Sequence, residues 1–480
     1  MTSFRAPLFR VGLVGALLLS AACTRGPDFE PPAPTAPETF RSETLDGSSV
    51  ANTPWWDLYE DPALRELITQ GLENNRNVRE AMARIEEARS GLIIANADRI
   101  PKVNVVGAGL YQQRIGADSV AAFDNIRGVI SSSYELDLWG RVSRTNEAAL
   151  QGILATEEAF RTVTITLVSQ IASAYLGLRD IDARVLITRA TIQANRDSYD
   201  ILSSRAKGGL VPEVEVNRSS IQLAGSEATL QKLERARAQT ENVLSLLVGE
   251  LPRDIQRGLA LADQSFPPTV PPGLPSELLL RRPDVLGAER MLHAQTARIG
   301  IAEANRFPKI SLTGSLGAKR STLGPLSAGN LVFNLGGNIL APLFNSGALK
   351  AVAEAERART EQVLNQYEQI VLNAFREVED ALISVETYRL EHAARLRQLA
   401  ASRAVLATTE VLYEGGLITY MEVIDLQKSV YGMEMMASEA LQSHHASIVQ
   451  LYKALGGGWT PLDGLDSLAT SVPGRSDQAP

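Results

Sequence analysis

Several kinds of residue are scarce in this chain. It has one cysteine, Cys23, so a disulfide within the chain is impossible. Of its four histidines, His444 and His445 are adjacent, whereas two imidazoles that share a metal ion on a helix are usually four residues apart. The net charge of −8 lacks the basic excess that binding to a phosphate backbone requires. We therefore expect no catalytic residue, no metal site, no cofactor and no nucleic-acid partner.

Long apolar runs are also missing. After the first 22 residues, charged residues interrupt every apolar run before it reaches the roughly 20 residues that a transmembrane helix needs. If the chain crosses a membrane, it must therefore do so through strands.

The N-terminus has the order of a secretory signal peptide. Arg5 and Arg10 precede a short apolar run, and small residues then lead to Cys23. A cysteine at this point resembles a bacterial lipobox, although Ser20 stands where that pattern prefers leucine. We expect residues 1–22 to be removed and Cys23 to be acylated, since two or more acyl chains anchor a protein firmly. The alternative is a plain signal peptide with an incidental cysteine.

The rest of the chain consists of two copies of one unit. A shift of 207 positions places Pro101–Val103 over Pro308–Ile310, because 101 + 207 = 308. The same shift places Gly208–Val211 over Gly415–Ile418. A register kept over so much sequence indicates an internal duplication.

The duplication and the composition predict the domain organisation. The expected parts are a signal peptide (1–22), a lipid-anchored linker (23–54), repeat 1 (55–250), a Pro-rich connector (251–281), repeat 2 (282–459) and a flexible tail (460–480). Each repeat is expected to hold a first helix, a strand pair and long coiled-coil helices. The first helices are predicted at 62–99 and 282–306, and the strand pairs at 102–137 and 309–342.

Two stretches without proline, 142–207 and 348–414, predict very long helices. About 65 residues of helix extend roughly 100 Å. In the first stretch the apolar residues alternate steps of three and four, with Thr188 and Asn195 as polar exceptions. This spacing predicts a coiled-coil seam. Its positions are Ile171, Ala174, Leu178, Ile181, Val185, Thr188, Ile192, Asn195, Tyr199 and Leu202.

The predicted strands number four, which is too few to close a barrel. Open strand edges are not tolerated in lipid, because unpaired backbone groups there cost several kcal/mol each. Several copies would therefore have to close one barrel together, and the strands alone leave the number of copies open.

Seven segments, taken in order, resemble a known family. They are Gly26–Phe29, Trp55–Tyr59 with Asp61-Pro62, Tyr134–Arg141, Arg281–Val285, Phe307–Gly314, Phe375–Leu382 and Leu451–Trp459. Together they resemble outer-membrane factors of the TolC/NodT type, in particular the lipoproteins of tripartite efflux systems, over nearly the whole mature chain. The resemblance implies an α+β membrane channel-tunnel, in which a trimeric 12-stranded β-barrel is continued by a long 12-helix α-barrel.

The same resemblance implies the function. Such a protein is the outer-membrane exit duct of an export pump, and it passively conducts cargo from a proton-driven inner-membrane transporter and a periplasmic adaptor to the exterior. It would be a homotrimer, anchored in outer-membrane lipid and extending into the periplasm. Drugs or other toxic organic molecules are the expected cargo, with metal ions and proteins left open. The alternative reading is a coiled-coil scaffold or adhesin lipoprotein.

The resemblance also places the candidate site residues. The adaptor would contact the turns between the long helices, at Gly208, Gly209, Leu210, Gly415, Gly416 and Leu417. A periplasmic gate would use Glu422, Asp425 and Tyr413. Carboxylates repeated by threefold symmetry would repel one another and attract cations. The basic partner that some family members use in this gate falls on Ile418 here, which leaves the locking contacts of the gate undefined.

Overall fold

A computed structural model of the chain describes residues 24–32, 40–41, 59–115, 120–265, 275–320 and 331–457. The expected signal peptide, the acylation at Cys23 and the tail 460–480 lie outside the described residues. Among the helices that are described, none is long and apolar enough to cross a membrane.

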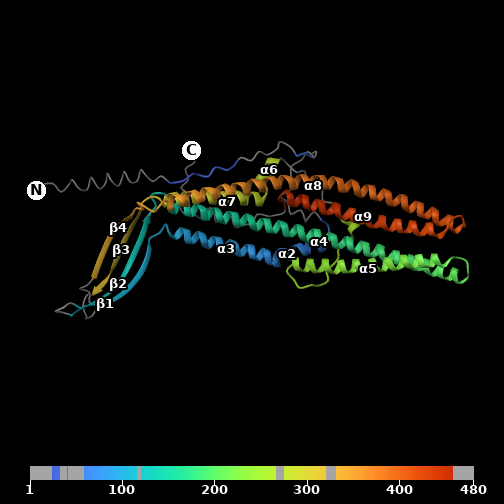
Figure 1. The fold of residues 1–480 in the computed structure, drawn as a ribbon, viewed down its shortest axis with the longest axis horizontal. Helices are drawn as coiled ribbons and strands as arrows, with labels where there is room; N and C mark the ends of the chain where they lie inside the picture. Colours follow the sequence, from blue (N-terminus) through green and yellow to red (C-terminus); the bar gives the residue numbers. More distant parts are fainter. Residues whose placement is uncertain are drawn as a thin grey trace. The chain divides into compact units, whose positions relative to one another are not determined.

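Helices and strands follow one another in nearly the same order in both halves of the chain (Figure 1). The first half contains α2 (Pro62–Asn74), α3 (Arg76–Ala97), β1 (Lys102–Ile115), β2 (Val120–Leu136), α4 (Arg141–Lys207) and α5 (Glu213–Leu247). The second contains α6 (Pro275–Arg281), α7 (Pro283–Ala304), β3 (Lys309–Arg320), β4 (Leu331–Leu340), α8 (Ala348–Glu414) and α9 (Tyr420–Ala454), after a short 3-10 turn η2 (Leu261–Asp263).

These elements belong to two compact units. The first unit comprises residues 1–34, 82–158 and 284–370, and it contains the sheet. The second comprises residues 35–81, 159–283 and 371–480, and it contains both turns between the long helices. Each unit therefore draws on both sequence repeats.

The sheet of the first unit has the antiparallel order β1-β2-β3-β4. The strand pairing of its first hairpin becomes that of its second hairpin when every residue number is raised by 207. Lys102 pairs with Ser133 in the first hairpin, and Lys309 pairs with Leu340 in the second, each partner 207 positions further on (102 + 207 = 309; 133 + 207 = 340). The duplication is therefore kept residue by residue in the strand pairing.

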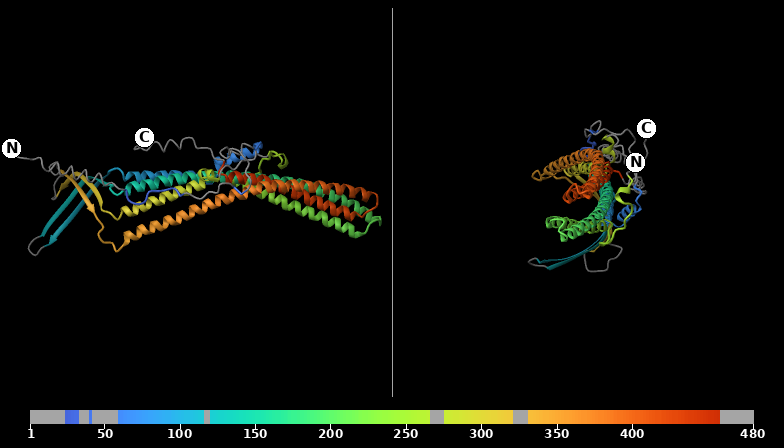
Figure 2. Two further views of the ribbon diagram at one scale, coloured as in Figure 1. Left: turned by 90° about the horizontal axis from the view of Figure 1, so that it is seen from above. Right: turned by 90° about the vertical axis from the view of Figure 1, so that its right-hand side faces the viewer.

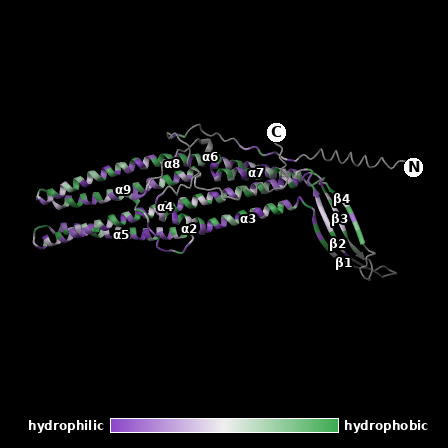
Figure 3. Ribbon diagram, turned by 180° about the vertical axis from the view of Figure 1, so that it is seen from behind, coloured by the Kyte–Doolittle hydropathy of each residue, from purple (hydrophilic) through white to green (hydrophobic). Residues whose placement is uncertain are grey.

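The two faces of this sheet differ in polarity. One face carries large apolar side chains such as Val105 and Leu335, which are 81% and 77% exposed in the single chain. Figure 3 shows how strongly β4 is apolar. The opposite face is lined by hydroxyl and amide groups, which include Asn104, Ser131, Ser133, Thr313, Ser315 and Asn334. Because successive residues of a strand point to opposite faces, the period-two pattern of the sequence produces this division.

The long helices α4 and α8 have the same length, 67 residues each. At the start of α4, the Asp137 carboxylate accepts hydrogen bonds from the backbone N–H groups of Val142 (2.9 Å) and Ser143 (2.8 Å). These bonds satisfy donors that have no partner within the helix.

The predicted coiled-coil seam of α4 is confirmed, because all ten of its positions are buried or half-buried. Its two polar members have partners on different neighbours. Thr188 lies 3.0 Å from the Tyr431 hydroxyl of α9, and Asn195 donates to Ser226 of α5 at 2.8 Å. Each polar position therefore specifies one neighbouring helix, as isolated polar residues in coiled coils do.

Two sequence predictions need correction. The first helix is not continuous over 62–99 but breaks at Asn75, whose backbone is extended (φ −60°, ψ 134°). The Asn75 side chain accepts from the Asn77 N–H (2.8 Å) and donates to the Leu247 carbonyl (2.8 Å), so it caps α3 and ties it to the end of α5. The Pro-rich connector ends in a helix, α6, because Pro275 at its start has the φ value that suits a first helical turn.

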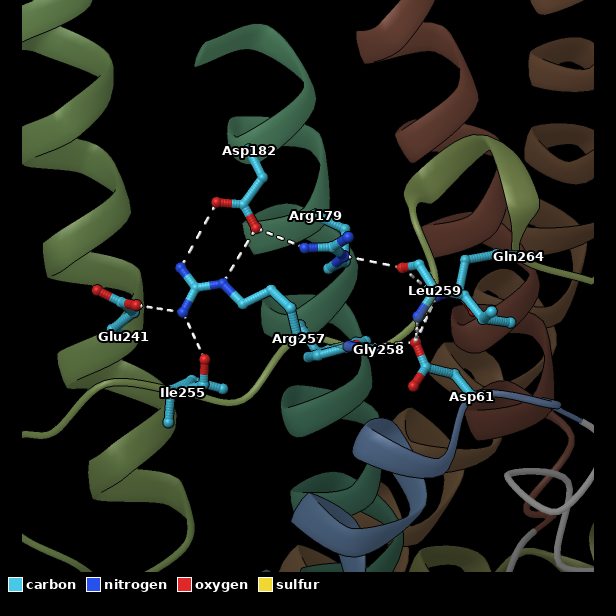
Figure 4. A network of polar contacts seen from close by, with 10 residues as sticks. Asp61, Arg179, Asp182, Glu241, Ile255, Arg257, Gly258, Leu259 and Gln264 are labelled. Atoms are coloured by element: carbon cyan, nitrogen blue, oxygen red, sulfur yellow. Dashed lines mark hydrogen bonds and ion pairs between the residues drawn. The ribbon is translucent and has the colours of Figure 1, made fainter. Parts of the chain in front are cut away.

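A buried polar network holds residues 251–265 in the second unit (Figure 4). Asp61, at the start of α2, accepts from the Leu259 N–H (3.0 Å) and the Gln264 amide (2.6 Å). In the same segment, Arg257 bonds to Asp182 of α4 at 3.1 Å and is also paired with Glu241 of α5. The segment is thereby fixed to three helices, α2, α4 and α5.

Candidate functional site at the helix-pair tips

The helix pairs α4–α5 and α8–α9 each reverse direction through a short glycine turn (Figure 2). At the first turn, Leu210 donates its N–H to the Arg205 carbonyl and Gly209 donates to Ala206, both at 2.9 Å. The second turn repeats these bonds from Leu417 and Gly416, at 3.0 and 2.9 Å. This pair of bonds needs a left-handed residue, which favours glycine.

The glycines at these turns have that conformation. The φ values are +70° at Gly209 and +74° at Gly416. Two further pairs of left-handed glycines share the 207-residue spacing, namely Gly140 with Gly347 and Gly249 with Gly456. The turns therefore follow the duplication in backbone conformation as well as in sequence.

Each turn presents one exposed leucine. Leu210 is 77% exposed and Leu417 is 74% exposed, and both lie at the outermost part of their helix pair. Since neither side chain packs inside its own turn, each offers an apolar contact point to another molecule.

Glu422 and Asp425 lie three residues apart in the first turns of α9, and both are exposed. Residues three positions apart share one face of a helix. Acidic residues at this end of a helix are also stabilised by its dipole, so the pair would be favourable here even without a gating role.

Tyr413, in the last turn of α8, is held by a residue that the sequence analysis did not identify. Its hydroxyl is bonded to the guanidinium of Arg205 of α4, whose central carbon also lies 5.6 Å from the centroid of the tyrosine ring. Next to it, Tyr420 of α9 donates to the Ser198 hydroxyl of α4 at 2.5 Å, and burial raises the pKa of Tyr420. The two helix pairs are thus joined at their tips by polar contacts.

Ile418 supplies no basic group, and Tyr413 has one from another helix. The basic group that faces Tyr413 comes from α4, as Arg205, so it lies in the other repeat of the same chain. No spacing in the sequence points to this contact, because Arg205 and Tyr413 lie in different helix pairs and are brought together by packing.

The adjacent histidines lie in the core of the second unit. His445 is fully buried, and burial lowers its pKa to about 3, so its imidazole is neutral at physiological pH. The His444 and His445 ring centroids are 6.4 Å apart. Within the described residues, no group of three or more His, Cys, Asp or Glu side chains is arranged to hold a metal ion.

The segment that follows Cys23 packs on the first unit. The Arg25 guanidinium lies 4.5 Å from the centroid of the Phe307 ring, and Asp28 pairs with Arg144 of α4 at 2.5 Å. Phe29 stacks on His293 of α7 with ring centroids 4.3 Å apart. These contacts account for the Gly26–Phe29 motif, which fixes the chain within a few residues of the expected acylation point.

The family model described as "Outer membrane efflux protein" matches the chain twice, over residues 67–250 and 274–457. The two matches start 207 residues apart (274 − 67 = 207), so they coincide with the internal repeat. Together they cover more than half of the chain.

Curated relatives and a solved structure agree with this match. The chain is 32% identical to the cation efflux system protein CusC of Escherichia coli, over 92% of this chain and 97% of that protein. It is also 32% identical to the solvent efflux pump outer membrane protein SrpC of Pseudomonas putida, over 93% and 97%. The open state of the outer membrane channel MtrE of Neisseria gonorrhoeae superposes with a TM-score of 0.83 at 31% identity, covering 91% of this chain and 98% of that one. The duplicated strand pairs, the paired long helices and their glycine tips therefore identify this chain as a member of the outer membrane efflux protein family.

Proposed function

We propose that three copies of this chain close into a duct that passes small molecules through the outer membrane. The duct would be passive, and the energy would come from a proton-driven transporter in the inner membrane, to which a periplasmic adaptor joins it. The observation that carries this proposal is the four-stranded sheet, which has one exposed apolar face and two open edges.

Such a sheet is not stable in lipid as a single copy. β1 pairs only with β2, and β4 only with β3, among the described strands of one chain. Unpaired edge groups would be costly in hydrocarbon, and closure removes both edges. Three copies of four strands give twelve, with the apolar face toward lipid and the hydroxyl and amide face toward the lumen. A coiled-coil scaffold or adhesin offers no account of this division of polarity.

Anchoring in the outer membrane is proposed to involve acylation at Cys23. The packed segment at residues 25–29 supports this, because it would hold the acyl chains at a fixed place on the folded channel. Acyl chains add membrane affinity to that of the sheet.

Small organic molecules are the proposed cargo. CusC is named for cations and SrpC for solvents, so relatives at the same identity serve different pumps. The proposed lumen face of the sheet carries neutral hydroxyl and amide groups together with the basic residues Lys102, Arg127 and Lys309, and this mixed composition favours no single chemical class. Selection of cargo is then left to the transporter and adaptor.

The exposed leucines at the tips are the proposed contact with the adaptor, and the carboxylates of Glu422 and Asp425 are the proposed gate. Three copies would bring six carboxylates to the entrance of the duct. These like charges would attract cations, so the entrance would favour cations. They would also repel one another, and moving them apart relieves this repulsion, which favours a wider entrance.

A cellular export assay tests the adaptor contact. In cells that lack their own copy of this gene, the double variant Leu210→Asp, Leu417→Asp should restore export at least severalfold less well than the wild type, measured as accumulation of a fluorescent dye. The variant Leu210→Met, Leu417→Met keeps the apolar contact and should export like the wild type. Equal export by the aspartate and methionine variants, at equal amounts in the membrane, would show that the leucines do not contact the adaptor.

A further inference from the structure

The polar network of the second unit covers an ion pair on α4 (Figure 4). Arg179 and Asp182 lie 2.7 Å apart, and their side chains are only 11% and 18% exposed. From the segment 251–265, Arg257 lies 3.1 Å from Asp182. The Leu259 carbonyl of the same segment accepts from the Arg179 guanidinium at 2.9 Å. We refer to Arg179 and Asp182 as the covered pair.

The equivalent ion pair on α8 is open to solvent in the part of the chain that the structure describes. The repeat shift places the covered pair over Glu386 and Arg389 (179 + 207 = 386; 182 + 207 = 389). These two side chains also lie 2.7 Å apart, but they are 58% and 54% exposed. We refer to them as the exposed pair. The order of the charges is reversed, since the base comes first on α4 and the acid comes first on α8. A segment that covered the exposed pair would therefore bring an acid to Arg389, where the first repeat brings a base to Asp182.

The chain leaves α9 in the same way as it leaves α5. Gly249 and Gly456 are both left-handed, with φ values of +78° and +71°. The residue after each glycine donates its N–H to the carbonyl five residues earlier, at 2.9 Å for Glu250 and at 3.0 Å for Gly457. The backbone that leads the segment 251–265 onto α4 is therefore repeated up to Gly457.

The sequence after Gly457 contains a charge-reversed counterpart of the covering segment. Arg257–Leu259 reads Arg-Gly-Leu, and Asp463–Leu465 reads Asp-Gly-Leu, one position short of the full repeat shift (257 + 206 = 463). The glycine of the first repeat is needed for a close approach, because a Cβ atom on Gly258 would lie 1.9 Å from an Asp61 carboxylate oxygen. The second repeat thus carries reversed charges both on its long helix and in the sequence that follows α9.

We propose that residues 460–467, the first part of the expected flexible tail, dock on the exposed pair of their own chain. Asp463 would accept hydrogen bonds from the Arg389 guanidinium, in the place that a base and an acid occupy with opposite signs in the first repeat. The segment 460–467 contains two acids, Asp463 and Asp466, and no base, so its charge complements that of Arg389. The docking joins parts of one chain, so it does not depend on closure of the duct.

The segment is long enough to reach Arg389. Arg282 bonds to the Ala454 carbonyl at 3.0 Å and to Glu377 at 2.8 Å, so α9 ends at the level of Glu377 on α8. Arg389 lies 12 residues further along α8 (389 − 377 = 12), which is about 18 Å of helix. The seven residues from Gly456 to Asp463 (463 − 456 = 7) reach about 23 Å when they are extended.

Zero-length cross-linking of the full-length protein tests the docking. A carbodiimide joins an amine to a carboxylate that it contacts, so the variant Arg389→Lys should give a linked peptide that contains Asp463, found by mass spectrometry in chains of monomer size. The matched variant Arg376→Lys lies 13 residues earlier on α8 (389 − 376 = 13), about 20 Å away, and should give no link to Asp463. A link from Arg389→Lys to the linker residues 42–58 instead, or to Asp463 in covalent dimers only, would overturn the proposal.

A charge exchange tests whether the two side chains attract one another. Asp463→Arg should make cleavage of the tail by thermolysin, which cuts before apolar residues, at least severalfold faster than in the wild type. Adding Arg389→Asp to that variant should restore the slow rate, because the attraction returns with its signs exchanged. Asp477→Arg makes the same change of charge further along the tail and should leave the rate unchanged.

The rates also state what would contradict the docking. Equal cleavage of Asp463→Arg and wild-type protein, or no recovery in the double variant although its circular dichroism matches that of the wild type, would overturn the proposal. Either result would leave the proposed duct intact, because conductance is measured separately and the sheet does not involve residues 460–467.

Discussion

Several buried polar contacts of the second unit converge on Asp61. Its carboxylate caps α2 through the Ala63 N–H at 2.9 Å and accepts the Tyr175 hydroxyl at 2.8 Å, in addition to Leu259 and Gln264. Burial raises the pKa of Tyr175, and the hydrogen bond that its hydroxyl donates to the Asp61 carboxylate raises this pKa further. One side chain thus connects α2, α4 and the segment 251–265.

Replacing Asp61 with asparagine should lower the free energy of unfolding by about 2–4 kcal/mol. The amide keeps the size of the side chain but replaces one acceptor with a donor, so at least one buried donor loses its partner. Thermal or chemical unfolding followed by circular dichroism would measure the change. Glu60→Gln, at the exposed neighbouring position, should be within about 0.5 kcal/mol of the wild type. Similar losses in both variants would mean that the network adds no stability.

The residues of the proposed gate show how far residue-level prediction from sequence could go. Tyr413 and the two acids on α9 were placed from a family pattern, whereas Arg205 was not, because a partner in another helix follows from packing and not from spacing. Its position in the last turn of α4, opposite the last turn of α8, becomes evident only when the helix pairs are placed side by side.

The long helices were predicted well because their signals are local. The stretch 348–414 matches α8 at both ends, and 142–207 differs from α4 by one residue. Both helices end where glycine permits the left-handed turn. The break at Asn75 was missed because it depends on a bond to Leu247, which is remote in sequence.

The turn glycines provide a test at the scale of elements. Gly209→Ala should destabilise the first tip by about 1 kcal/mol, because an L-residue is strained at φ +70° although nothing lies within 4 Å of a new Cβ atom. Hydrogen exchange read by mass spectrometry should show faster exchange in peptides that span 205–215.

Gly208→Ala is the matched control for this change. Gly208 is not left-handed, and its added Cβ atom would meet the Arg205 carbonyl at an ordinary 3.5 Å. Its exchange rates should stay close to those of the wild type. Equal acceleration in both variants would show that loss of glycine flexibility, and not the left-handed conformation, controls the tip.

At the scale of the whole molecule, the duplication lets one repeated sequence unit build a large channel. Each chain supplies two equivalent strand pairs and two equivalent helix pairs, so a threefold ring presents six similar units around its axis. The number of copies was predicted from the family resemblance. The open strand edges indicate that the sheet must be closed by further copies, but they do not indicate how many.

Planar-bilayer conductance of the purified, acylated protein tests the central claim most directly. A duct of three copies with an acidic entrance predicts small, cation-favouring, flickering currents. The double variant Glu422→Ala, Asp425→Ala should change their size and reduce the preference for cations severalfold, while Glu439→Ala, at an exposed acid further along α9, should not. Wild-type currents that the double variant leaves unchanged would contradict the gate, and the absence of any pore in every preparation would contradict the duct itself.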